Sequence, residues 1–159
     1  PLTGLNTRRA LFEKHGSGPL PVGAAVAIFD LDHFKEVNDR YGHAVGDEVL
    51  ERFGRLLDRH AGRMTTAART GGEEFVLIFE STAAEPVHAT VDRIREAFSN
   101  LSVRTGGGPL RCTVSVGVSF ASDTNRTLDG VLQEADIALY LAKRHGRNRV
   151  AMNGLLVAA

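Results

Sequence analysis

The sequence has one cysteine, Cys112, and no tryptophan. A single cysteine cannot form a disulfide within the chain, and Cys112 stands in an apolar run, as is typical of a protein in a reducing cytoplasm. No apolar stretch approaches the roughly 20 residues that a membrane-spanning helix needs, and no signal peptide is evident. We therefore expect a cytoplasmic domain with no direct membrane contact.

The sequence also has no excess of charge, because 19 Lys and Arg residues balance 19 Asp and Glu residues. Proteins that bind nucleic acid over a broad surface normally carry a basic excess. We therefore expect no nucleic-acid partner, and any anionic ligand must be held by a few locally placed cations. At 159 residues, 43% of them hydrophobic, the chain is long enough to form one domain over residues 1–159 with its own core.

Hydrophobic patterns predict alternating helices and strands. A continuous apolar run at 24–29 predicts a central strand buried on both faces, whereas the alternation at 112–120 predicts a strand covered on one face only. A break at 41–46 precedes a helix that runs to about residue 60, with Asp47 in its first turn. The other predicted elements are helices at 6–15, within 30–39, at 86–98 and at 128–145, and strands at 64–70, 75–79 and 149–152. This order fits an α/β (α+β) fold in which helices pack on a mainly antiparallel sheet.

Residues 69–75 read Arg-Thr-Gly-Gly-Glu-Glu-Phe between two predicted strands. Gly71 and Gly72 predict the tip of a β-hairpin, because glycine reaches positive φ without steric cost, and they leave room for a charged ligand near the backbone. Glu73 and Glu74 follow, and successive strand residues point to opposite faces. Adjacent like charges are unfavourable unless a cation offsets them. The turn is therefore either a solvated hairpin tip or an oxygen-rich metal site beside a phosphate-binding loop.

A second acidic group, Asp30-Leu31-Asp32, ends the predicted central strand, where a rigid support could present ligands. With it, eight blocks of sequence occur in the order typical of one family. They read Leu-Thr-Gly-Leu at 2–5, Phe-Asp-Leu-Asp-His-Phe-Lys at 29–35, Asn-Asp at 38–39, Gly-His at 42–43, Gly-Asp at 46–47, Gly-Gly-Glu-Glu-Phe at 71–75, Thr-Val-Ser-Val-Gly-Val at 113–118, and Ala-Asp-Ile-Ala-Leu-Tyr-Leu-Ala-Lys at 135–143 with Gly-Arg-Asn-Arg at 146–149. From residue 2 to about residue 150, the chain resembles the GGDEF domain of the diguanylate cyclase family.

The resemblance implies a fold similar to nucleotidyl cyclases and polymerase palm domains, with an active-site β-hairpin. It also implies an activity, the condensation of two GTP molecules into cyclic di-GMP with release of two pyrophosphates. Each 3′-hydroxyl attacks the α-phosphate of the other nucleotide in line, which requires positioning and neutralisation of charge.

By this resemblance, Mg²⁺, with Mn²⁺ as an alternative, is held by the carboxylates of Asp30 and Glu73 and by the backbone carbonyl of Leu31. Mg²⁺ prefers oxygen ligands and keeps waters and substrate phosphates in its shell, so few protein ligands are needed. Glu73 is also the candidate general base for the 3′-hydroxyl. Because a metal lowers the pKa of a carboxylate that binds it, we favour the metal-bridging role. Glu74 belongs to the same motif and is assigned a secondary catalytic role.

The resemblance also implies how guanine is recognised. Guanine needs an acceptor for its N1 and N2 hydrogens and a donor to its O6 or N7, and Asp47 and Asn38 supply these groups. Adenine presents the opposite edge, so Asp47 would reject it. From the local pattern alone, Asp47 is better explained as a carboxylate favoured by a helix dipole. His43 is either a structural turn residue or a substrate contact.

Three cations, Lys35, Lys143 and Arg147, are assigned by resemblance to the triphosphate and to the charge that develops during the reaction. Lys143 and Arg147 stand four residues apart around a predicted helix end, close enough to converge. Gly71 and Gly72 are assigned to the substrate as well. Without the order of the blocks, each of the three cations would be interpreted as a solvated surface residue.

The expected partners follow from the reaction. One domain holds one GTP, so catalysis requires a homodimer, and an N-terminal sensory or receiver module is expected in a longer regulatory protein of which this domain forms the C-terminal part. The alternative is a non-catalytic module that binds GTP or cyclic di-GMP, which the full set of site residues disfavours. A DNA-processing palm enzyme is disfavoured by the balanced charge.

Three features of the sequence depart from the family pattern. Thr7 stands where Asn is usual, but either Asn6 or Thr7 can cap the following helix. Thr70 replaces an aromatic or aliphatic residue before the glycines and is expected to loosen the hairpin. The family's product-inhibition site is an Arg-x-x-Asp sequence five residues before the two glycines. Here residues 62–65 read Gly-Arg-Met-Thr, so both charged anchors are absent.

We therefore predict no high-affinity product-inhibition site. Cyclic di-GMP is titrated against a Glu73 variant whose active site is blocked by a GTP analogue. We expect no tight binding, because neither the arginine nor the aspartate anchor is present. Saturable binding at sub-micromolar concentration would contradict this prediction.

Overall fold

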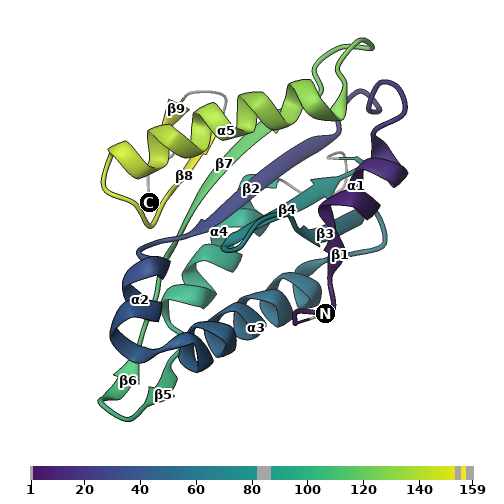
Figure 1. The fold of residues 1–159 in the computed structure, drawn as a ribbon. Helices are drawn as coiled ribbons and strands as arrows, with labels where there is room; N and C mark the ends of the chain where they lie inside the picture. The colour runs from purple at the N-terminus through teal and green to yellow at the C-terminus, as the bar shows by residue number, and fades with distance from the viewer. Residues whose placement is uncertain (1, 82–86, 153–154, 157–159) are drawn as a thin grey trace.

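The centre of the fold is a seven-stranded sheet with strand order β1-β3-β4-β2-β7-β8-β9. The structure is a computed structural model that describes residues 2–81, 87–152 and 155–156 (Figure 1). The elements in chain order are β1 (Asn6–Thr7), α1 (Arg8–His15), β2 (Ala25–Leu31), α2 (Phe34–Tyr41), α3 (His43–His60), β3 (Thr65–Arg69), β4 (Glu74–Phe79), α4 (Val87–Ser99), β5 (Val103–Thr105), β6 (Gly108–Leu110), β7 (Val114–Phe120), α5 (Leu128–Arg144), β8 (Val150–Met152) and β9 (Leu155–Leu156).

Strand β2 is the middle strand of this sheet. It pairs antiparallel with β4 on one side and with β7 on the other. The pairs β3–β4 and β8–β9 are also antiparallel, whereas β1–β3 and β7–β8 are parallel. The prediction of a mainly antiparallel sheet flanked by helices is confirmed, as is the prediction that residues 24–29 are buried on both faces.

Helices cover the two faces of the sheet unequally (Figure 1). On one face, α1 and α5 pack against β2, β3 and β4 through residues such as Leu11, Ile28 and Leu139. On the other face, α2, α3 and α4 form a larger core. There the Phe53 ring of α3 lies 5.6, 4.8 and 4.9 Å, centroid to centroid, from the rings of three phenylalanines, which are Phe29, Phe75 and Phe98. One aromatic cluster thus holds α3 and α4 against the strands that carry Asp30 and Glu74.

The break predicted at 41–46 is much shorter in the structure. Only Gly42 separates α2 from α3, and its φ of 90° lets the chain change direction within one residue. Because α3 begins at His43, Asp47 lies in its second turn, and the prediction that Asp47 occupies the first turn is wrong. The helix dipole therefore gives a weaker explanation for a carboxylate at this position.

The prediction that strand 112–120 is covered on one face only is also wrong. In β7, Ser115 and Ser119 are fully buried, as are the valines that alternate with them. The reason is α5, which lies directly on the face that carries the small residues. A Cβ atom at Gly117 would lie 2.1 Å from the Ala135 carbonyl oxygen and 2.3 Å from the Leu139 nitrogen. Small side chains here therefore indicate close packing of a helix, not exposure to solvent.

Other differences concern the short elements. Strands β1, β5, β6 and β9 are not predicted from the sequence, and β5–β6 form a small separate hairpin around the glycines at 106–108. Thr7 caps α1, because its hydroxyl accepts a hydrogen bond from the Ala10 N–H at 3.1 Å. The predicted helix at 86–98 is observed as α4, and Pro86 lies outside the described residues.

The contact between α5 and Gly117 predicts a large effect of a small substitution. Gly117→Ala should lower the free energy of unfolding by about 1–3 kcal/mol or more, because the new methyl group meets backbone atoms of α5 that cannot rotate away. Urea unfolding at equilibrium measures the change. Gly62→Ala is the matched control, since no atom lies within 4 Å of its added Cβ, and it should change stability by less than about 0.5 kcal/mol. Equal stability of the two variants would contradict the packing.

Candidate active site

The end of β2 and the β3–β4 hairpin bring two acidic side chains together. Asp30 pairs with Glu74 across β2 and β4, and the Leu31 N–H donates to the Glu73 carbonyl oxygen at 3.2 Å. Beside this bond, the carboxyl groups of Asp30 and Glu73 lie within hydrogen-bonding reach of each other. The two acids that the sequence places on separate strands are therefore neighbours.

A lysine from α5 lies against this pair. The Lys143 Nζ is 3.1 Å from the Asp30 Oδ2. Burial raises the pKa of Asp30 above its ordinary value, the Lys143 ammonium opposes this rise, and the Asp32 carboxylate adds to it. Burial, and then repulsion by Asp30, raises the pKa of Glu73. The negative charge of the pair is therefore only partly offset by one lysine.

This donor set fits a hard divalent cation. Asp30 and Glu73 offer carboxylate oxygens, and a cation between them would favour the charged forms that burial disfavours at both residues. Within residues 2–81 and 87–152, no group of three or more His, Cys, Asp or Glu side chains is placed to hold a metal. Mg²⁺ commonly takes one or two carboxylates and completes its shell with water and substrate phosphates. The pair is therefore suited to a metal that binds together with a phosphate ligand.

The Gly71-Gly72 turn is held by an arginine. The Arg69 guanidinium donates to the Gly71 carbonyl oxygen at 3.2 Å and to the Gly72 carbonyl oxygen at 2.7 and 3.2 Å. Neither glycine has a positive φ, so the expectation that they reverse the chain through that conformation is wrong. The chain instead turns over the four residues 70–73, with the Thr70 and Gly71 N–H groups donating to the Glu74 carbonyl oxygen. A Cβ at Gly72 would meet no atom within 4 Å, so this side of the turn is open to a ligand.

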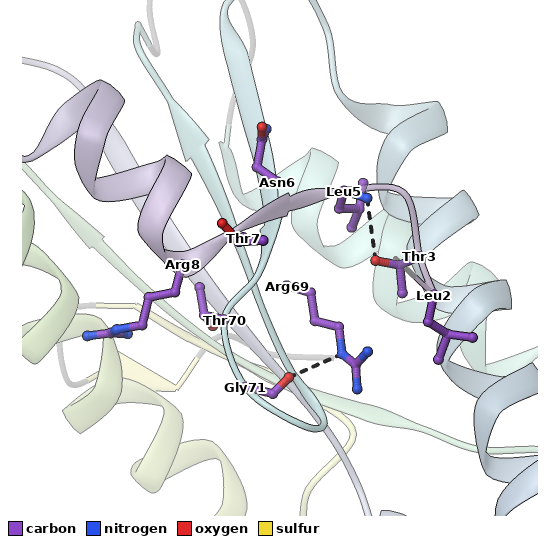
Figure 2. A pocket seen from close by; sticks show the side chains of 9 residues that line it. All are labelled: Leu2, Thr3, Leu5, Asn6, Thr7, Arg8, Arg69, Thr70 and Gly71. Carbon is purple, nitrogen blue, oxygen red and sulfur yellow. Dashed lines mark hydrogen bonds between the residues drawn. The ribbon is translucent and has the colours of Figure 1, made fainter.

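A pocket of about 280 Å³ lies beside this turn. Figure 2 shows the N-terminal segment on one side of it and the hairpin on the other, with Arg69 reaching from β3 toward Gly71. Its lining residues are Leu2, Thr3, Leu5, Asn6, Thr7, Arg8, Arg69, Thr70 and Gly71. The first residues of the described chain thus line the same pocket as the turn that carries Glu73.

Thr70 fixes Glu74. The Thr70 hydroxyl donates to the Glu74 Oε1 at 2.9 Å. Glu74 therefore has its own hydroxyl partner, while the Glu73 carboxyl faces Asp30. The expected loosening of the hairpin by Thr70 is not supported by this geometry, since the threonine adds a bond that an aromatic or aliphatic side chain could not make.

The predicted base-reading residues lie on α2 and α3. Asn38 packs over Gly46, where a Cβ would come within 1.9 Å of the Asn38 Oδ1. His43 and Asp47 are exposed and one helical turn apart on α3, and Lys35 is exposed in the first turn of α2. In the part of the chain that the structure describes, these four side chains have no hydrogen-bond or ion-pair partner, so they are available to a ligand.

Of the two predicted cations near the end of α5, only Lys143 lies on the helix. Lys143 lies in the last turn of α5 and contacts Asp30, whereas Arg147 lies beyond the helix, which ends at Arg144. Arg147 is exposed and has a φ of 64°, which places it in a tight left-handed turn before β8. Its position therefore depends on the α5–β8 turn and not on helical spacing.

Asp32 has a structural environment that the sequence analysis did not assign. Its carboxylate is 5% exposed and accepts hydrogen bonds from the Thr113 and Ser115 hydroxyls at 2.7 and 2.6 Å and from the Asn148 N–H at 3.1 Å. The signal in the sequence was the polar pair Thr113 and Ser115 on a strand whose alternate residues are valines.

Comparison with known proteins identifies the family. The protein-family model described as "Diguanylate cyclase, GGDEF domain" matches residues 1–149. This chain belongs to the diguanylate cyclase GGDEF family. It is 36% identical over 143 residues to diguanylate cyclase A of Treponema denticola, covering 90% of this chain and 38% of that protein. It is 37% identical over 158 residues to the response regulator PleD of Caulobacter vibrioides, covering 94% of this chain and 34% of that protein.

Solved structures of GGDEF domains have the same fold. The GGDEF domain of DgcB from Caulobacter crescentus, in complex with c-di-GMP, superposes with a TM-score of 0.87 at 33% identity, over 96% of this chain and 94% of that one. The active GGEEF domain of a Vibrio cholerae diguanylate cyclase gives a TM-score of 0.82 at 28% identity, over 94% and 97% of the two chains. Residues 71–75 of this GGDEF domain also read Gly-Gly-Glu-Glu-Phe.

The chain spans only about a third of the length of the two curated relatives described above. Among the helices of the described residues, none combines the length and apolar character needed to cross a bilayer.

The raised pKa of Glu73 predicts that its ionised carboxylate lowers the free energy of unfolding at neutral pH. A group whose pKa is higher in the folded than in the unfolded state contributes stability at low pH, and this contribution is lost as the pH rises through the folded value. For Glu73 that loss begins above the ordinary value of 4.5. Without metal at pH 7, Glu73→Gln should therefore be more stable than the wild type, by less than about 1 kcal/mol because the site is partly solvated.

Urea unfolding in EDTA at pH 7 and pH 4 measures this effect. The gain should shrink toward pH 4, where the wild-type carboxyls also become neutral. Glu96→Gln, at an exposed position of α4, is the control and should show no gain. A Glu73→Gln variant that is less stable than the wild type at pH 7 would show that the carboxylate pair is not repulsive.

Proposed function

We propose that this GGDEF domain condenses two GTP molecules into cyclic di-GMP and two pyrophosphates. The single observation that carries the proposal is the Asp30–Glu73 carboxyl pair, with Lys143 3.1 Å from Asp30, beside an open glycine turn. Family membership supports the same reaction, since relatives with this domain are named diguanylate cyclases.

Asp30, Glu73 and the Leu31 carbonyl are the groups that would hold Mg²⁺ or Mn²⁺. When bound, such a cation supplies neutralisation of phosphate charge and a fixed geometry for the reacting oxygens. Lys143 already faces Asp30 and is placed to share the charge of a triphosphate. Gly71 and Gly72 carry no side chain, so their backbone permits phosphates to approach the carboxylates closely.

The reaction forms a bond between each 3′-oxygen and the α-phosphorus of the other nucleotide, breaks the bond to pyrophosphate and releases the hydroxyl proton. Glu73 is the candidate group to accept this proton. Its raised pKa makes it a better proton acceptor than an ordinary glutamate, but a shared cation would lower that pKa again. We therefore assign Glu73 first to metal binding, and Glu74, bonded to Thr70, to support of the turn.

Base recognition is assigned to α2 and α3. Asp47 accepts from the N1 and N2 hydrogens of guanine, and Asn38, ordered against Gly46, donates to O6 or N7. His43, one turn before Asp47, is placed to contact the same nucleotide. Lys35 and Arg147, both exposed, supply positive charge to the phosphates.

Because one domain holds one GTP, two domains must face each other, and the working unit is a homodimer. The relatives are longer than this chain, and PleD is named a response regulator. We therefore propose that an N-terminal sensory or receiver module controls pairing in the full-length protein. The free thiol of Cys112 fits a cytoplasmic location.

The second candidate is a module that binds GTP or cyclic di-GMP without turnover. DgcB binds c-di-GMP through a domain of this fold. The unpartnered Asn38 and Asp47 side chains would serve binding alone equally well, and the Asp30–Glu73 pair would then hold a cation together with the bound triphosphate, so turnover decides between the two candidates.

The test is release of pyrophosphate from GTP and Mg²⁺. We expect turnover per domain to rise with protein concentration, because two domains must meet. Asp30→Asn and Glu73→Gln should each reduce the rate about 100-fold or more, since each would weaken binding of the cation that neutralises charge at the reacting phosphates. Glu96→Gln is the control and should keep the wild-type rate. Binding of GTP without any release of pyrophosphate, at every protein concentration, would favour the second candidate.

A further inference from the structure

A buried carboxylate that the mechanism does not use lies two residues after Asp30. The Asp32 side chain accepts three hydrogen bonds from two separate segments of the chain. Its Oδ1 accepts from the Ser115 hydroxyl, and its Oδ2 accepts both from the Thr113 hydroxyl and from the Asn148 N–H. In addition, the Asp32 N–H donates to the Thr113 carbonyl oxygen at 2.9 Å. Asp32 is therefore fully engaged by protein donors.

The Asn148 bond ties Asp32 to a strained turn. Arg147 and Asn148 both have positive φ, 64° and 46°, a backbone conformation that residues other than glycine rarely adopt. Such a conformation persists only where its surroundings hold it. The Arg147 N–H donates to the Ala142 carbonyl oxygen at 3.1 Å, and the Arg149 carbonyl oxygen accepts from the Val116 N–H at 3.0 Å. Asp32 supplies the bond at the middle of the turn.

A second tether reaches the same turn from the opposite side of the sheet. The Arg95 Nη1 of α4 donates to the Asn148 Oδ1 at 2.9 Å, and the Arg95 Nε is 2.7 Å from Asp92. Arg95 is 8% exposed, which is unusual for arginine and indicates a structural role. The backbone and the side chain of Asn148 are thus both held.

We propose that Asp32 is a positioning residue for nucleotide binding, which fixes the α5–β8 turn so that Arg147 is set relative to the Asp30 carboxylate. The inference rests on the proposed function, because Arg147 is assigned there to the triphosphate. Asp30 is the penultimate residue of β2 and Asp32 directly follows that strand, so the bond from the Asn148 N–H to Asp32 links the end of β2 to the residue after Arg147. A misplacement of about 1 Å at a reacting group can cost about 100-fold in rate.

Two variants separate positioning from direct metal binding. Asp32→Asn keeps one carbonyl oxygen, which can accept from the Asn148 N–H and the Thr113 hydroxyl, while its amide donates to the Ser115 Oγ. Asp32→Ala removes all three acceptor contacts. If Asp32 is a positioning residue, Asp32→Asn should behave like the wild type and Asp32→Ala should not. If Asp32 were a metal ligand, both substitutions would impair activity.

The measurements are the KM for GTP, kcat, and amide hydrogen exchange at residues 145–149 without nucleotide or metal. For Asp32→Ala we expect a KM raised about tenfold or more and faster exchange in the turn. For Asp32→Asn we expect both quantities to stay within about threefold of the wild type. Arg95→Met removes the other tether without touching Asp32, and it should change KM and exchange in the same direction, which keeps the test decisive if Asp32→Ala fails to fold.

The outcomes distinguish this inference from the proposed function. If the wild type releases no pyrophosphate, the proposed function fails, while the exchange data still report whether Asp32 holds the turn. If the wild type is active and Asp32→Asn loses as much activity as Asp32→Ala, Asp32 acts through its charge and the inference is overturned. It is also overturned if Asp32→Ala and Arg95→Met leave both KM and exchange unchanged.

Discussion

The candidate active site depends on the antiparallel pairing of β2 with β4. This register places Asp30 opposite Glu74 and brings the backbone of Leu31 into a hydrogen bond with Glu73. Because side chains alternate along a strand, a shift of one residue would turn Asp30 away from the hairpin. The register is fixed by the buried aromatic cluster around Phe53, which includes one ring from each of the two strands. Hydrophobic packing therefore determines where the two carboxylates meet.

Much of the fold could be predicted from the sequence. The apolar run 24–29 and the helical spacing in 128–145 correspond to β2 and α5, because burial on both faces or on one stripe leaves a clear period. The wrong predictions for the strand at 112–120 and for the break at 41–46 have one cause. Small residues are found on exposed surfaces and in loops, but also where two elements pack closely or where the chain turns within one residue. Ser115 and Gly117 looked like a solvent-facing strand surface, whereas they make room for α5. Gly42 alone, and not a longer break, separates two helices.

The site was predictable only in part. The order of the motifs predicts which acids and cations form the site, but not how they interact. The sequence does not show that Lys143 contacts Asp30, that Arg69 holds the glycine turn, or that Thr70 bonds Glu74, because these contacts depend on the placement of α5 and on the exact shape of the turn. Asp32 was overlooked because its three donors come from residues more than 80 positions away.

The absence of a side chain at Gly117 has a further consequence for control of the domain. With α5 in backbone contact with β7, the helix cannot slide along the sheet without a collision, and a shift by one turn of about 5.4 Å would carry Lys143 out of reach of Asp30. The contact thus fixes the position of α5 along β7. Under the proposed function, a regulatory signal would then act by presenting whole domains to each other or by keeping them apart.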